Sequence, residues 1–150
     1  MNAQEYFEQV RETVIDIERS KEMLERLLAS EGIKPINYDA HTSGGVAGDG
    51  MNVVNQRIEF ERRLKQRIAD TNELLDEANA VLYGYDDHSG LAKAKGNRYA
   101  DVLCMAYCQA MPWDEIADIM RCSQQWCREL SRSAFKHVDA LGFARLRGGK

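Results

Sequence analysis

Residues 99–138 constrain the fold more than any other part of the chain, because they carry two amphipathic helical patterns around a short break. The first pattern ends at residues 120–122, and Ser123 stands where the next helix would begin. A serine there can cap the helix by accepting a hydrogen bond from a free backbone N–H. Two helices joined so tightly are typical of a helix-turn-helix, whose second helix enters the major groove of DNA. The sequence therefore predicts a helix-turn-helix within residues 98–141, with double-stranded DNA as the leading partner.

The helix expected after Ser123 has one apolar face and one polar face. Its inner face, predicted from helical spacing, consists of Cys127, Leu130, Ala134, Phe135 and Val138. On the polar face, glutamine side chains can bond adenine, arginine can bond guanine, and lysine can contact backbone phosphate. The DNA-binding residues that we predict are Arg121, Ser123, Gln124, Gln125, Trp126, Arg128, Glu129, Arg132 and Lys136.

Two shorter helices are predicted ahead of the break. The first covers residues 98–109 and presents an apolar side to the core. The second begins near Pro112, whose missing N–H costs nothing at a helix start. It carries Ala117, a small residue that lets two helices approach closely. Arg121 follows it where glycine is common, so we expect a left-handed backbone conformation at this arginine.

The N-terminal half predicts two long helices. Apolar residues recur at steps of three and four over residues 3–30, and along one face over residues 52–83, which is the spacing of a coiled-coil seam. Residues 34–50 between them lose this periodicity and are rich in glycine, so we expect a flexible loop. Residues 1–83 should therefore form an antiparallel helical hairpin. A two-helix seam is weak on its own, which favours a homodimer through these helices.

Two further segments complete the predicted organisation. Residues 84–97 include GYDDHSGLAKAKG and are expected to act as a hinge, and residues 142–150 are expected to form a basic frayed tail. The predicted fold class is all-α, with a long coiled-coil-like helical hairpin followed by a helix-turn-helix domain.

Charge is unevenly distributed along the chain, whose net charge is −4. Residues 1–50 carry 5 Lys or Arg against 10 Asp or Glu, and residues 51–90 carry 5 against 8. Residues 91–150 carry 10 against 6, so positive charge is concentrated on the predicted helix-turn-helix. A positive excess of this size predicts that the region contacts phosphate with moderate affinity, and that a second subunit or a protein partner assists the binding.

The residues around the break resemble the promoter-reading region 4 of bacterial sigma-70-type factors. There, an aromatic residue ends one helix, a short helix contains Glu-Ile-Ala, and a serine after the turn precedes the recognition helix. The matching residues here are Tyr107, residues 113–117 (WDEIA) and Ser123. More narrowly, the layout resembles the ArpU-like late-gene regulators of phages and prophages. The opening Met-Asn-Ala-x-x-Tyr of that family is similar to residues 1–6, and the start of its recognition helix is similar to residues 123–127 (SQQWC).

The resemblance implies a cytoplasmic, nucleoid-associated transcription regulator that reads DNA and contacts RNA polymerase. No segment resembles the part of a sigma factor that melts promoter DNA, so a partial sigma mimic is expected rather than a complete sigma factor. Two other functions stay open. Small terminase subunits of phages, which package DNA, also combine a helix-turn-helix with helical oligomerisation segments. A protein-interaction module that docks on RNA polymerase without autonomous DNA binding is favoured by the overall acidity and by Glu129.

Nothing in the sequence predicts an enzyme, a cofactor or a bound metal. The cysteines are spaced more widely than structural zinc ligands prefer, and most occupy predicted core positions, so we favour buried thiols over a metal site. These residues are Cys104, Cys108, Cys122 and Cys127. Trp113 and Trp126 are expected to anchor helices rather than to stack on nucleic acid, with Trp126 the better candidate for a surface contact.

The sequence also predicts a cytoplasmic location. No apolar run approaches the length of a membrane-spanning helix. The opening MNAQEYFEQV lacks the apolar core of a signal peptide.

Overall fold

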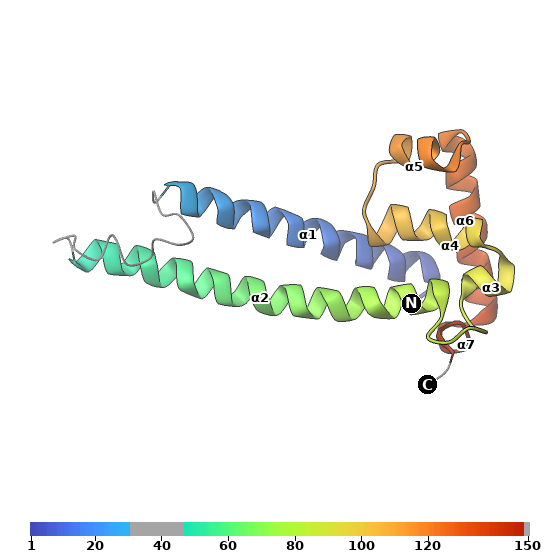
Figure 1. The fold of residues 1–150 in the computed structure, drawn as a ribbon, viewed down its shortest axis with the longest axis horizontal. Coiled ribbons are helices and arrows are strands. Elements are labelled where there is room, and N and C mark those ends of the chain that lie inside the picture. The colour runs from blue at the N-terminus through green and yellow to red at the C-terminus, as the bar shows by residue number, and fades with distance from the viewer. Residues whose placement is uncertain (31–46, 149–150) are drawn as a thin grey trace. The chain divides into compact units, whose positions relative to one another are not determined.

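The computed structural model describes residues 1–30 and 47–148, and all regular structure in these ranges is helical. The helices are α1 (Ala3–Ser30), α2 (Ala47–Tyr83), α3 (Leu91–Lys95), α4 (Asn97–Leu103), α5 (Trp113–Met120), α6 (Gln124–Leu141) and α7 (Phe143–Arg147) (Figure 1). A π-helical turn, η2 (Cys104–Cys108), continues α4. None of the described residues lies in a β-strand, which confirms the predicted all-α class.

The chain divides into two compact units. Unit 1 consists of Met1–Ile15 and Thr71–Lys150, and unit 2 consists of Asp16–Asp70. This division differs from the predicted one, which grouped residues 1–83 as a separate hairpin. The start of α1 and the end of α2 instead belong to the same unit as α3 to α7.

An aromatic cluster explains why the start of α1 belongs to unit 1. The Phe7 side chain is fully buried, and its ring centroid lies 6.0 Å from that of Phe135 and 6.3 Å from that of Tyr107. The Tyr107 and Phe135 rings are 5.3 Å apart in an edge-to-face arrangement, which is favourable for aromatic quadrupoles. Burial of one phenylalanine contributes roughly 1.5–3 kcal/mol. This cluster therefore joins α1, η2 and α6 into one core.

Polar contacts add to this packing. The Ala3 backbone N–H donates to Asp139 Oδ1 at 2.8 Å, so a side chain of α6 satisfies a free N–H at the start of α1. The Arg11 guanidinium donates to the Ala106 carbonyl at 2.6 Å. The Tyr6 hydroxyl donates to Glu77 Oε1 of α2 at 3.1 Å. The first three turns of α1 are thus tied to three other elements of unit 1.

Unit 2 contains the second part of α1 and the first part of α2. Ile17 and Leu64 are buried, and Arg67 Nη1 donates to Ser20 Oγ at 2.9 Å, so the two helices are in contact here. Helix α2 begins at Ala47, inside the segment predicted as a loop. Residues 47–50 are therefore helical, and the rest of that predicted loop lies outside the described residues.

Two short helices replace segments that were expected to be irregular. The predicted hinge at residues 84–97 contains α3, whose Leu91 is fully buried. The predicted frayed tail contains α7, whose Leu146 is 3% exposed. The Arg147 carbonyl accepts hydrogen bonds from the Tyr85 N–H at 2.9 Å and from Ser89 Oγ at 3.2 Å. These hydrogen bonds join the two segments, and Leu91 and Leu146 both belong to the core of unit 1.

Candidate functional site

The candidate site is built on α5, the turn at residues 121–123, and α6, which all lie in unit 1 (Figure 1). Helix α5 ends at Arg121, which has φ 58° and ψ 47°. This left-handed conformation was predicted from the sequence and is confirmed. The backbone N–H groups of Arg121 and Cys122 both donate to the Ala117 carbonyl, the latter at 3.2 Å. These bonds close α5 and fix the path of the chain into the turn.

Ser123 fixes the start of α6. Its backbone is extended, with φ −71° and ψ 157°, and its Oγ accepts a hydrogen bond from the Trp126 N–H at 3.0 Å. The predicted N-cap is therefore confirmed. Such a cap stabilises a helix by about 1 kcal/mol. It also sets the direction in which the first turn of α6 leaves the turn at residues 121–123.

The inner face of α6 agrees with the prediction. All five predicted residues are buried, each no more than 6% exposed: Cys127, Leu130, Ala134, Phe135 and Val138. The buried Ser131, which the apolar pattern did not identify, lies on the same side. Ile116 and Ala117 of α5 are also buried, and α5 packs on α6. The rotation of α6 about its axis is therefore fixed by packing.

The predicted DNA-binding residues lie in the turn and along the other face of α6. Eight side chains are exposed: Arg121, Ser123, Gln124, Gln125, Trp126, Arg128, Arg132 and Lys136. Glu129 is half-buried. On an α-helix, residues separated by three, four or seven positions share a face. Gln125, Arg132 and Lys136 therefore form one row, and Gln124, Arg128 and Arg132 form a neighbouring row.

Arg128 has a second partner within the site. Its guanidinium carbon lies 5.7 Å from the centroid of the Trp113 ring, which is cation–π distance. Trp113 is half-buried against the core of unit 1, as expected for an anchor between helices. Arg128 is thus held on the side of α6 that faces α5.

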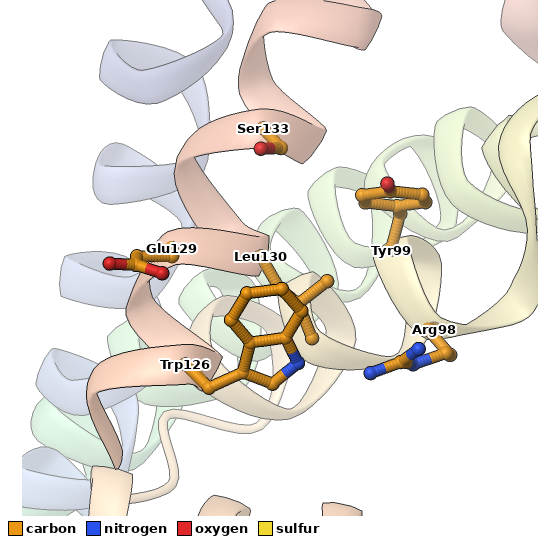
Figure 2. Close-up of a pocket in the computed structure, with 6 residues that line it drawn as sticks. All are labelled: Arg98, Tyr99, Trp126, Glu129, Leu130 and Ser133. Atoms are coloured by element: carbon orange, nitrogen blue, oxygen red, sulfur yellow. The ribbon is translucent and has the colours of Figure 1, made fainter. Parts of the chain in front are cut away.

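A pocket of about 210 Å³ lies beside Trp126, and its lining residues come from α4 and α6: Arg98, Tyr99, Trp126, Glu129, Leu130 and Ser133 (Figure 2). Figure 2 shows the Trp126 indole and the Arg98 guanidinium projecting toward one another from the two helices. Trp126 is 44% exposed, so one side of its ring is open to solvent.

Arg98, Tyr99 and Ser133 were not predicted as site residues. The approach of Arg98 and Tyr99 to Trp126 depends on how α4 packs on α6, which local sequence patterns do not specify. Ser133 lies seven residues after Trp126 on α6 itself, a spacing from which it could have been predicted. The only sequence signal for Arg98 was the excess of positive charge over residues 91–150.

Charge is separated between the two helices of the site. Helix α5 exposes the carboxylates of Asp114, Glu115 and Asp118, whereas the exposed charges on the predicted DNA-binding face of α6 are those of Arg128, Arg132 and Lys136. The exposed carboxylate of α6, Asp139, lies near the other end of the helix. Exposed charges interact over about 8–10 Å at physiological salt. An anion approaching α6 is attracted, and the same anion approaching α5 is repelled.

The four cysteines are free thiols. Cys108 and Cys127 are buried, and Cys104 and Cys122 are half-buried. Among the described residues, no group of three or more His, Cys, Asp or Glu side chains is arranged to hold a metal ion.

Comparison of the chain with protein-family models, with curated proteins and with solved structures gave no match. Within residues 1–30 and 47–148, no helix combines the length and the apolar character needed to cross a membrane.

Proposed function

We propose that this chain is a sequence-specific DNA-binding transcription regulator that inserts α6 into the major groove. The observation that carries the proposal is the arrangement of α5, the capped turn and α6. Packing buries one face of α6 and leaves an uninterrupted polar face that begins at its capped end. This is the arrangement expected of a helix-turn-helix, in which the N-terminal residues of the second helix contact base edges.

The exposed residues suit different parts of a DNA duplex. Gln124 and Gln125, in the first turn of α6, have the donor and acceptor pair that adenine requires. Arg128 and Arg132, one and two turns further along, can bond guanine or phosphate. Lys136 lies nearest the end of the row and suits backbone phosphate. The exposed indole N–H of Trp126 and the Arg98 guanidinium add two donors beside the same helix.

The acidic side chains set the expected strength of binding. Glu129 and the three exposed carboxylates of α5 oppose the approach of phosphate, so one copy should bind with moderate affinity. We therefore propose that α1 and α2 act as an antiparallel helical hairpin that joins two copies. Two linked copies bind two half-sites, and the second contact becomes intramolecular. The resemblance to sigma region 4 and to ArpU-like regulators supports a proposed role in the control of phage genes.

The experiment is selection of bound sequences from a random duplex library at two salt concentrations. Wild type is compared with Arg128→Ala/Arg132→Ala and with Arg62→Ala/Arg63→Ala. The second variant removes the same charge from exposed positions on α2 in unit 2. Because Arg128 also contacts Trp113, the circular dichroism of each variant is recorded first.

We expect wild type and the α2 variant to enrich one common motif, and the α6 variant to lose it. Affinity for that motif should fall about 10–100-fold for each arginine that reads a base, and the salt dependence should become shallower by about one unit for each lost phosphate contact. Absence of a motif at both salt concentrations would refute autonomous sequence-specific binding. An equal effect of the two double variants would refute the assignment to α6.

A second candidate function, docking on RNA polymerase, is favoured by the outer face of α5. Ile119 is 58% exposed and shares a face of the helix with the exposed carboxylate of Glu115, four residues earlier. An exposed apolar side chain beside an acidic group suits a basic protein surface. Titration of purified polymerase with wild type and with Ile119→Lys tests it, and equal affinity of the two proteins would refute docking through α5.

A further inference from the structure

The cysteines at the turn lie in contact with each other. The Sγ atoms of Cys122 and Cys127 are 3.2 Å apart. Cys122 belongs to the turn and is half-buried, whereas Cys127 is on α6 and fully buried. Only Cys122 is therefore open to a solute in solvent, and the partner thiol is already in place behind it.

We propose that Cys122 and Cys127 are an oxidation site that a peroxide converts into an intramolecular disulfide. A disulfide requires an S–S distance of about 2.0 Å, so the sulfur atoms must approach by a little more than 1 Å. Cys122 can supply much of this movement because it lies outside both helices. The backbone of Cys127 is held within α6, and its N–H donates to the Ser123 carbonyl at 3.0 Å.

The exposure of the two thiols sets the order of the steps. The Cys122 thiolate attacks one oxygen of hydrogen peroxide, the O–O bond breaks, and the sulfur becomes a sulfenic acid while the other oxygen leaves as water after protonation. The Cys127 sulfur then attacks the sulfenic sulfur. An S–S bond forms, the S–O bond breaks, and a second water leaves with the Cys127 proton. Two thiols and one peroxide thus give one disulfide and two waters.

The chemistry of Cys127 agrees with its role as the second reactant. Burial and the hydrogen bond with Cys122 raise the pKa of Cys127 to about 11. Cys127 therefore stays protonated at neutral pH and reacts slowly with an oxidant. Its reaction requires a sulfenic acid on Cys122, whose sulfur already lies at contact distance.

Disulfide formation would act on the geometry that the proposed function needs. Ser123, the cap of α6, lies next to Cys122 in the turn, and the Cys122 N–H anchors the turn to Ala117 of α5. Drawing Cys122 toward Cys127 strains both contacts and changes the direction of the first turn of α6. We therefore expect oxidation to weaken DNA binding, and this consequence alone rests on the proposed function.

The other cysteine pair provides a matched control. Cys104 and Cys108 stand at the two ends of η2, away from the turn. A hydrogen bond with the Cys108 thiol lowers the pKa of Cys104 to about 7, so a large fraction of the Cys104 thiol is ionised at neutral pH. Cys104→Ser removes this competing thiol and leaves the proposed site intact.

The test treats full-length protein with hydrogen peroxide, alkylates the remaining free thiols, and maps peptides by mass spectrometry. Wild type and Cys104→Ser should each contain a peptide that links Cys122 to Cys127 and is lighter by two hydrogens, and dithiothreitol should reverse the change. Cys122→Ser should lack this species. It is a conservative change at a half-buried position, and Cys122→Ala serves the same purpose if serine disturbs the fold.

Alkylation of both Cys122 and Cys127 after peroxide treatment would overturn the proposal, as would a disulfide to any other cysteine. DNA affinity is measured separately on reduced and oxidised protein, and we expect a loss that dithiothreitol restores. Reduced protein that fails to bind any sequence would refute the proposed function, while the mapped disulfide would still support the oxidation site.

Discussion

Replacement of Phe7 by alanine tests whether the start of α1 is part of the core that supports α6. The Phe7 side chain is fully buried, and its ring lies within 5.2 to 6.3 Å of the rings of Tyr6, Phe135 and Tyr107. Deletion of a phenylalanine from such a site costs about 3–5 kcal/mol, because the transfer energy is lost and a cavity remains. We expect the free energy of unfolding of unit 1 to fall by this amount.

Tryptophan fluorescence during urea unfolding is the appropriate assay, because Trp113 and Trp126 both lie in unit 1. With a slope of about 2 kcal/mol per molar urea, the midpoint should decrease by about 2 M. Phe7→Leu retains most of the buried volume and should lose about 1.5 kcal/mol or less. Met23→Ala, on an exposed part of α1 in unit 2, is the control and should change the midpoint little.

A midpoint for Phe7→Ala within about 0.3 M of wild type, that is, a loss below about 0.6 kcal/mol, would refute the reasoning. It would mean that the α3 to α7 region is stable without α1, as the sequence alone suggests. A double-mutant cycle with Phe135→Leu adds a second criterion. Residues in contact show coupling of about 0.5 kcal/mol or more, and additive losses would contradict the observed ring contact.

Three further predictions concern single side chains. Ser123→Ala should lower the free energy of unfolding by about 1 kcal/mol in the same urea assay, whereas Ser123→Asp keeps an acceptor for the Trp126 N–H and should retain most of it. Arg11→Met should lower the free energy of unfolding by about 1–3 kcal/mol, because the Ala106 carbonyl loses a charged donor. Arg19→Met, at an exposed position of α1, should change it by no more than about 0.5 kcal/mol, and equal effects would contradict the role of the Arg11 hydrogen bond. Because the pKa of Cys104 is lowered to about 7 and that of Cys127 is raised to about 11, the rate at which iodoacetamide alkylates Cys104 should increase through pH 7 and level off above it, while Cys127 stays unreactive there. Mass spectrometry of peptides from reactions quenched at pH 6 to 9 measures both rates, and parallel profiles would refute the difference.

The parts of the site that the sequence predicted depend on local signals. Ser123 caps α6 because a hydroxyl two or three residues before a free N–H can reach it in any helix of this kind. Arg121 takes the left-handed conformation because the chain must leave α5 and begin α6 within three residues. The buried face of α6 follows from a spacing of three and four residues, which has the same meaning wherever the helix packs. Such features need no knowledge of distant contacts.

The parts that the sequence did not predict depend on contacts between distant segments. The coiled-coil spacing of residues 3–30 indicated that one face is buried, but it could not indicate that Phe7 packs on Phe135 while Ile17 is buried in the other unit. Leu146 lies in a glycine-flanked basic segment, and its burial in the core of unit 1 brings together segments that are far apart in the sequence. The pocket at Arg98 likewise requires the observed packing of α4 on α6.

Helices α1 and α2 each contribute to both units, since unit 1 ends within α1 at Ile15 and resumes within α2 at Thr71. The segment 98–141 alone would lack the buried side chains of Phe7, Val10 and Leu82, which belong to the same core cluster as α4 to α6. The loss of one buried side chain of this kind costs a large part of the free energy of unfolding of a domain of this size, so such a domain tolerates only one or two losses. The helix proposed to read DNA is therefore supported by the same two helices that are proposed to join two copies. Because α1 and α2 are continuous α-helices that each carry residues of both units, the proposed binding and the proposed association would need no separate linker.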